Sequence, residues 1–331
     1  MERFALAAAV VLGFALTAAL CSLFVPLRRV LERREQNQQP VQPEQPRPAP
    51  LRAPLWGGLC AAAGTVAAVG VGWLAACVGQ PELLGSEGRL MTRLLTALAG
   101  SLVFGAVGLA EDLARMRSPA ALGLRRDVRL LLEALAAAFV LLLLRVAGCL
   151  PRGLGVPGAG YVLLGSAVPF LWAVLMVALA ECARIAERDE GTVCGAAFVA
   201  MLALMMAEAG LGVPGLAVLP AALAGALVAL GLWAFPPARL GVGCCGSLLA
   251  AGAIGCIPLS LDMTSLTVPL ALPFWAAGGL LAAQLLGAKR TGKPLRCWVK
   301  KHKMSPETVF LCSFALSAVG YVLALALLRW C

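Results

Sequence analysis

The sequence predicts an all-α polytopic membrane protein with about ten transmembrane helices. Hydrophobic residues make up 61% of the 331 residues and charged residues only 13%, whereas about a quarter of the residues of a water-soluble domain are charged. The mean hydropathy is +0.89, and the charged residues cluster between apolar runs of about 20 residues, the length that crosses a bilayer. Helices are expected because a chain in lipid must satisfy its own backbone hydrogen bonds.

The expected spans follow one another with short connections. The sixth and seventh spans are separated only by a short stretch around Gly210, Gly212, Pro214 and Gly215, and a short loop joins the eighth to the ninth. Nine spans therefore remain an alternative to ten. The first span is longer than a signal-peptide core and is followed by Arg28 and Arg29, so we interpret it as a retained helix. The spans are 4–26, 54–79, 93–110, 128–148, 161–181, 193–211, 213–233, 243–260, 265–287 and 308–329.

The distribution of basic residues predicts that both termini lie outside. With ten spans and the N-terminus out, the inner loops hold 21 of the 27 Lys and Arg residues, as the positive-inside rule requires. The net charge of +10 is therefore explained without a nucleic-acid partner. The inner-loop enrichment predicts an inner-membrane protein whose charged loops lie on the cytoplasmic face.

The chain reads as a single transmembrane domain over residues 1–331. Residues 27–53 include a Gln- and Pro-rich stretch that we expect to form a flexible cytoplasmic loop, and residues 288–307 form a basic cytoplasmic loop. The twelve cysteines show no paired spacing, so we interpret most of them as small apolar residues within helices.

Four groups of polar residues on the expected cytoplasmic side are candidates for a functional site. Glu111 and Asp112 are adjacent carboxylates that suit Mg²⁺, or else pair with a nearby arginine at a solvated helix end. Residues 181–195 carry four acids that either bind a ligand or neutralise their own arginines. Residues 236–247 suit anion binding at a helix N-terminus or close helix packing. Residues 288–307 contain seven basic residues and the only histidine, His302.

The order of these groups resembles the polyprenyl-phosphate N-acetylhexosamine-1-phosphate transferases (glycosyltransferase family 4). Within them the chain looks most like the phospho-N-acetylmuramoyl-pentapeptide transferases (MraY), from about Pro54 to the end. The motifs that carry the resemblance are Pro54-Leu-Trp-Gly57-Gly58, Gly108-Leu-Ala-Glu-Asp112, Leu122-Gly-Leu-Arg-Arg-Asp-Val-Arg129 through Glu133, Pro169 through Gly195, Pro237-Ala-Arg-Leu-Gly-Val-Gly243-Cys-Cys-Gly246-Ser247, and Ser305-Pro-Glu-Thr-Val.

The resemblance implies that a lipid phosphate attacks the β-phosphate of a UDP-sugar, UMP leaves and a diphospholipid forms with the help of Mg²⁺. By alignment, Asp112 and Glu111 would be catalytic and lie near the metal and the lipid phosphate. The remaining residues aligned with the family's metal and substrate sites are Cys244 for the metal, and Glu187, Glu190, Arg184, Arg296, Lys300 and Lys301 for substrate.

Several aligned positions depart from the family pattern. Cys244 stands at the position of a metal-binding aspartate, and a soft thiolate suits Mg²⁺ poorly. Glu111 replaces the first of two paired aspartates, Glu181 and Arg184 replace two asparagines, and Arg296 opens the stretch that replaces a histidine cluster.

These departures leave three functions open. We expect an MraY-like transferase homologue that is catalytically impaired, with Mg²⁺ as cofactor if it is active. The alternatives are a non-catalytic membrane scaffold or lipid- and nucleotide-binding pseudoenzyme, and a small-molecule transporter that uses Glu208 within the sixth span. The partners implied are a polyprenyl phosphate lipid, a UDP-sugar nucleotide and the membrane, while homodimer formation stays open.

Overall fold

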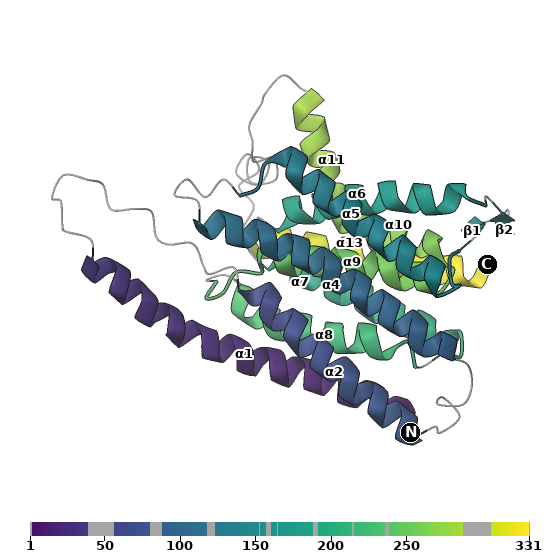
Figure 1. Cartoon of the computed structure of the whole chain (residues 1–331), viewed down its shortest axis with the longest axis horizontal. Coiled ribbons are helices and arrows are strands. Elements are labelled where there is room, and N and C mark those ends of the chain that lie inside the picture. Colours follow the sequence, from purple (N-terminus) through teal and green to yellow (C-terminus); the bar gives the residue numbers. More distant parts are fainter. Residues whose placement is uncertain are drawn as a thin grey trace.

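The chain folds into a bundle of long helices in the computed structural model (Figure 1). The structure describes residues 2–38, 56–79, 88–117, 123–151, 153–156, 160–163, 165–187, 191–213, 215–235, 238–286 and 306–330. The elements are α1 (Glu2–Gln38), α2 (Gly57–Gly79), α4 (Gly88–Arg117), α5 (Arg126–Val146), β1 (Gly153–Val156), β2 (Gly160–Leu163), α6 (Ala167–Ala186), α7 (Thr192–Gly210), α8 (Val218–Ala234), α9 (Gly243–Ser260), η1 (Thr264–Leu266), α10 (Thr267–Leu270), α11 (Leu272–Leu286) and α13 (Pro306–Trp330).

Seven of the described helices are long and apolar enough to cross a membrane: α1, α2, α4, α6, α7, α9 and α13. This confirms a helical, polytopic membrane protein. The other three expected spans contain no helix that is long and apolar enough by this measure, each for a local reason. Helix α5 carries five ionisable residues, α8 has only 17 residues, and the expected span 265–287 is divided into η1, α10 and α11.

The division of the ninth expected span coincides with two prolines. Pro269 lies in α10 and Pro273 lies in the first turn of α11. Proline lacks a backbone N–H and is favoured in the first turn of a helix, whereas further along it removes a hydrogen bond and crowds the preceding turn. A continuous helix through both prolines would lose hydrogen bonds, so a new helix begins at Leu272 instead.

A small antiparallel hairpin departs from the all-α expectation. Strand β1 pairs with β2, with Gly153 opposite Leu163 and Val156 opposite Gly160. The second strand takes the first residues of the expected span 161–181, and the helix itself begins at Ala167. Glycines at three of the eight paired positions disfavour helix here.

Helix α9 lies at the centre of the bundle. All of its residues from Gly243 to Ser260 are buried, and it packs mainly against α4 and also against α6, α2 and α7. Its many Gly, Ala, Ser and Cys residues let neighbouring helices approach closely, which is how helices associate in lipid.

The outer surface of the bundle is apolar. Along α5 the exposed side chains include Leu131, Leu135, Phe139, Leu142 and Val146, which are spaced by three or four residues and therefore share one helix face. Such a stripe suits contact with lipid, although α5 carries charges at both ends.

Both ends of the chain point to the same end of the bundle. Figure 1 shows the N-terminal end of α1 and the C-terminal end of α13 on the side of the β1–β2 hairpin. Helix α1 lies along one edge and contacts α2 and α8. It continues to Gln38, so residues 27–38 of the expected flexible loop are helical. Residues 39–53 and 288–305 of the two expected loops lie outside the described residues.

Candidate functional site

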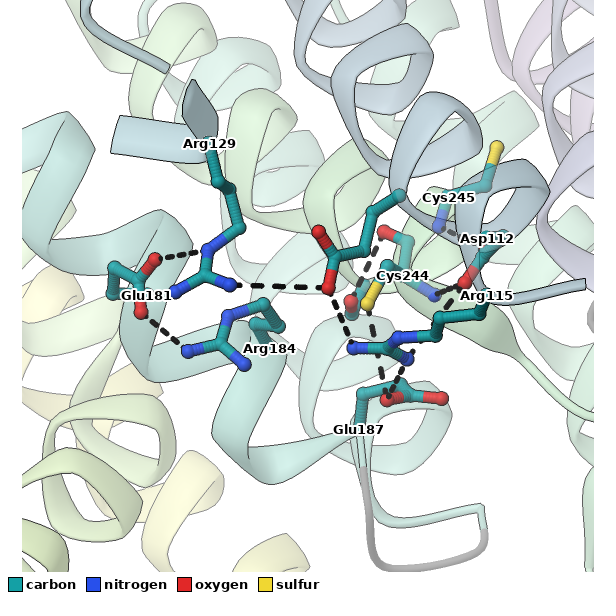
Figure 2. A network of polar contacts seen from close by, with 10 residues as sticks. Asp112, Arg115, Arg129, Glu181, Arg184, Glu187, Cys244 and Cys245 are labelled. Atoms are coloured by element: carbon teal, nitrogen blue, oxygen red, sulfur yellow. Dashed lines mark hydrogen bonds and ion pairs between the residues drawn. The ribbon is translucent and has the colours of Figure 1, made fainter. Parts of the chain in front are cut away.

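Four helix ends meet at the end of the bundle opposite the hairpin. They are the C-terminal ends of α4 and α6 and the N-terminal ends of α5 and α9, and together they carry a network of charged side chains (Figure 2). The elements follow one another in the sequence in the order α4, α5, α6, α9, so the network joins residues up to 133 positions apart.

Asp112 closes the N-terminal end of α9. Its Oδ1 accepts a hydrogen bond from the backbone N–H of Cys244 at 3.0 Å, and its Oδ2 accepts one from Cys245 at 2.9 Å. The first N–H groups of a helix have no partner within the helix and attract negative charge. Asp112, which is fully buried, therefore serves as a capping group supplied by a neighbouring helix.

Glycines make this close approach possible. A Cβ atom at Gly108, one turn before Asp112, would overlap the backbone of Cys244, and a Cβ at Gly58 of α2 would overlap Gly246. The N–H of Gly57 donates to the carbonyl of Gly241 at 3.2 Å, and that of Gly58 donates to Val242 at 3.0 Å. The glycine motifs singled out in the sequence thus bring α2 and α4 onto the start of α9.

Arg115 lies among three carboxylates. Its Nη2 is 3.1 Å from Glu111 Oε1, and its Nη1 is 3.9 Å from Asp112 Oδ1 and 3.7 Å from Glu187 Oε2 (Figure 2). The side chains of Glu111, Asp112 and Glu187 are 3%, 0% and 10% exposed, and that of Arg115 is 17% exposed. The guanidinium is the nearest cation to all three acids among the ion pairs of the described residues.

A second set of ion pairs joins α5 to α6. Arg129 Nε donates to Glu181 Oε1 at 2.6 Å, and Arg184 Nη2 donates to Glu181 Oε2 at 2.5 Å. Arg129 Nη1 also lies 3.8 Å from Glu111 Oε1. Glu111 therefore links the two sets, and the charges alternate along one continuous network from Arg184 to Glu187 (Figure 2).

Two buried acids at this end have oxygens without a hydrogen-bond partner. Oε2 of Glu111 has none, and neither oxygen of Glu133 has one, although Glu133 is fully buried one helical turn after Arg129. Buried carboxylates without such partners are costly, so the network depends on its arginines for charge balance.

The structure brings together four of the five predicted site residues that it describes. Glu111, Asp112, Glu187 and Cys244 meet at one place, where the thiol of Cys244 lies 4.0 Å from Glu187 Oε2. Arg184, whose substrate-binding role stays a prediction, is paired with Glu181. The predicted substrate-binding residues that lie outside the described part of the chain are Glu190, Arg296, Lys300 and Lys301.

Sequence reasoning offered the pairing of Glu111 or Asp112 with a nearby arginine, but it did not assign Arg115 or Arg129 to the site. Arg115 follows Glu111 by four residues, and Arg129 precedes Glu133 by four, a spacing that places side chains on one helix face. That spacing predicts pairing within a helix. It does not predict that Arg115 reaches Glu187 or that Arg129 reaches Glu181, because both contacts depend on how two helices pack.

A sequence model of glycosyl transferase family 4 matches residues 94–262, which run from α4 through α9 and contain the whole network. The match covers half of the chain. The chain belongs to glycosyl transferase family 4. It is also 29% identical, over 212 residues, to a phospho-N-acetylmuramoyl-pentapeptide-transferase from Synechococcus sp. (strain RCC307). That alignment takes in 63% of this chain and only 55% of the relative's length.

The resemblance to this family implies Mg²⁺, but the side chains at this site do not fit it. Mg²⁺ requires oxygen ligands in near-octahedral geometry. Both oxygens of Asp112 are engaged by backbone N–H groups, Cys244 offers sulfur, and a guanidinium stands among the remaining carboxylates. Among the described residues, no group of three or more His, Cys, Asp or Glu side chains is arranged to hold a metal ion.

Proposed function

We propose that this protein is an MraY-like membrane homologue of the phospho-sugar transferases whose transfer activity is lost or severely impaired. The observation that carries the proposal is the state of Asp112. Its carboxylate is used to cap α9 through Cys244 and Cys245, and the side chain that α9 presents beside it is a thiol instead of a carboxylate. This family member therefore retains the architecture of the site and lacks its metal-binding chemistry.

The balance of charge in the network supports the same conclusion. Phosphoryl transfer depends on cations that are positioned to neutralise phosphate oxygens. Arg115, Arg129 and Arg184 are all paired with acids. Four carboxyl groups share these three guanidinium groups: Glu111, Asp112, Glu181 and Glu187. Each of the three arginines is therefore already engaged by acids, which leaves it poorly placed to neutralise a phosphate.

An apolar cavity beside the network supports a lipid as binding partner. The cavity lies between α6, α7, α11 and α13, and its lining includes Ala186, Phe274, Leu280 and Leu316. Ala186 directly precedes Glu187, so a chain bound there would bring its head group to the acidic cluster. A polyprenyl phosphate fits this description, with a UDP-N-acetylhexosamine or UDP-MurNAc-pentapeptide as the other substrate class.

A non-catalytic lipid- or nucleotide-binding module is the second candidate. The described ion pairs join α4, α5 and α6, and hydrogen bonds to Asp112 join α9 to α4, so these polar side chains can serve the fold as structural contacts. A transporter is less well supported, because Glu208, although buried in α7, does not line the apolar cavity.

The proposed setting is a bacterial cytoplasmic membrane, crossed ten times with both termini outside. The seven candidate spans and the helices α5, α8 and α11 would together make the ten crossings. The charged network would then lie on the cytoplasmic side, where nucleotide substrates are found.

The test is Mg²⁺-dependent release of UMP from UDP-N-acetylglucosamine and UDP-MurNAc-pentapeptide by the purified protein with undecaprenyl phosphate. We expect no release by the wild type beyond that of Asp112→Asn. Release by the wild type that Asp112→Asn abolishes would show a working transferase and contradict the proposal. Release gained by Cys244→Asp, but not by the matched control Cys244→Ser, would identify the missing carboxylate as the cause.

A further inference from the structure

The position of Arg115 suggests a role that the family assignment does not supply. Its guanidinium contacts Glu111 and Asp112 on its own helix and Glu187 at the end of α6, at 3.1, 3.9 and 3.7 Å. Figure 2 shows the guanidinium between Glu187 and Asp112, beside the thiol of Cys244. One side chain of α4 thus balances carboxylates contributed by two helices.

Three carboxylates this close together need a positive charge between them. Like charges in a weakly polarisable interior repel strongly, and a buried charge without a partner destabilises the fold. Arginine suits this position because it stays charged at any physiological pH and offers five N–H donors in a fixed plane. A divalent cation would satisfy the same requirement.

We propose that Arg115 is a tethered cation that occupies the place of a divalent ion, so that the wild-type protein excludes Mg²⁺ and Mn²⁺ from this cluster. One observation supports the proposal independently of the charge count. The Oε2 of Glu111 is buried without a hydrogen-bond partner, so it remains available as a ligand if the guanidinium is removed.

Exclusion of divalent ions by Arg115 rests on the loss of metal-binding chemistry in the proposed function, but cation binding and UMP release are measured separately and can fail separately. A protein that releases no UMP for another reason would still bind or exclude a divalent ion. Likewise, divalent-cation binding by an active protein would still show whether Arg115 occupies the position of the ion.

The experiment measures divalent-cation binding by the full-length protein in detergent. Thermal unfolding would be followed in Mg²⁺, Mn²⁺ or EDTA, and Mn²⁺ binding would be measured by isothermal titration calorimetry. The variants are wild type, Arg115→Met and Arg117→Met. Arg117 lies two residues further along α4, is exposed and has no described ion pair, which makes it the matched control.

We expect Mg²⁺ and Mn²⁺ to leave the Tm of wild type and of Arg117→Met unchanged. Arg115→Met should be less stable in EDTA than wild type, and saturating Mn²⁺ should raise its Tm by roughly 3 °C or more, as expected for a ligand that binds only the folded state. Calorimetry should detect a Mn²⁺ site in this variant alone.

Two results would overturn the proposal. The first is Mn²⁺ binding by the wild type that Glu187→Gln removes, and the second is a folded Arg115→Met that binds no Mn²⁺. If Arg115→Met does not fold, Arg115→Met with Glu187→Gln decides the matter, because it removes one positive and one negative charge together. Folding of the double variant without Mn²⁺ binding would support the role of Arg115, and its failure to fold would contradict it.

Discussion

At the scale of single residues, Asp112 joins α4 to α9. It is fully buried, and each of its oxygens accepts one backbone N–H from the first turn of α9. The adjacent pair Glu111 and Asp112 was predicted from the sequence as a metal or catalytic pair. In the structure the two side chains make different contacts. Glu111 pairs with Arg115 and Arg129, whereas Asp112 accepts hydrogen bonds from the backbone N–H groups at the start of α9.

Replacing Asp112 with alanine should destabilise the protein strongly. The N–H groups of Cys244 and Cys245 would lose their partners in the interior, and each unsatisfied buried donor costs about 1–3 kcal/mol, so the free energy of unfolding should fall by roughly 2–5 kcal/mol. Thermal or denaturant unfolding in detergent measures the effect.

The control for this prediction is Asp127→Ala. Asp127 is also an aspartate next to a helix N-terminus, but it is exposed in the first turn of α5, so its loss should cost no more than about 1 kcal/mol. Equal destabilisation by the two variants would show that the capping contacts of Asp112 contribute little.

At the scale of helices, the start of α9 is held by hydrogen bonds to two neighbouring helices, α2 and α4. The first N–H groups of α2 donate to carbonyls just before α9, and the first N–H groups of α9 donate to a side chain of α4. Helix termini in lipid need such partners because no water is present to supply them. Side chains larger than hydrogen at Gly58 and Gly108 would separate these helices.

Two glycines on α2 give a matched test of this packing. A Cβ at Gly58 would overlap the backbone of Gly246, whereas a Cβ at Gly70 meets nothing within 4 Å. We expect Gly58→Ala to lower the free energy of unfolding by about 1–3 kcal/mol through overpacking. Gly70→Ala should raise it by roughly 0.5–1 kcal/mol, because alanine favours helix. Similar effects of the two changes would show that α2 and α9 do not touch at Gly58.

At the scale of the whole molecule, hydropathy predicted most of the fold. Every expected span contains a helix, since apolar length is read directly from the sequence. Three of them are nevertheless too charged, too short or too divided to count as candidate spans. The hairpin at Gly153–Leu163 and the division before Leu272 depend on glycine and proline at positions where hydropathy stays high.

The site was predictable in position but not in its contacts. The motifs around Glu111, Glu187 and Cys244 indicated one shared site, and the three residues do lie together around Arg115. The pairing of Arg129 with Glu181, and of Arg115 with Glu187, depends on the rotation of α5 and α6 relative to α4. A pattern of residues along one helix does not determine that rotation.

The ten-span arrangement makes a prediction about topology. Alkaline phosphatase should be active when fused to either terminus, and green fluorescent protein should fluoresce when inserted within 288–307, because 21 of the 27 basic residues lie in the expected inner loops. Termini that report on opposite sides would show an odd number of crossings and exclude ten.

The measurement that most directly tests the account is an experimental structure of the protein prepared in Mn²⁺, with the metal located by anomalous scattering. The account predicts the guanidinium of Arg115 between Glu111 and Glu187, and the carboxylate of Asp112 on the N–H groups of Cys244 and Cys245. It also predicts no manganese within about 2.6 Å of any of these acids. A manganese ion bound by Asp112, with Arg115 displaced from the carboxylates, would contradict it.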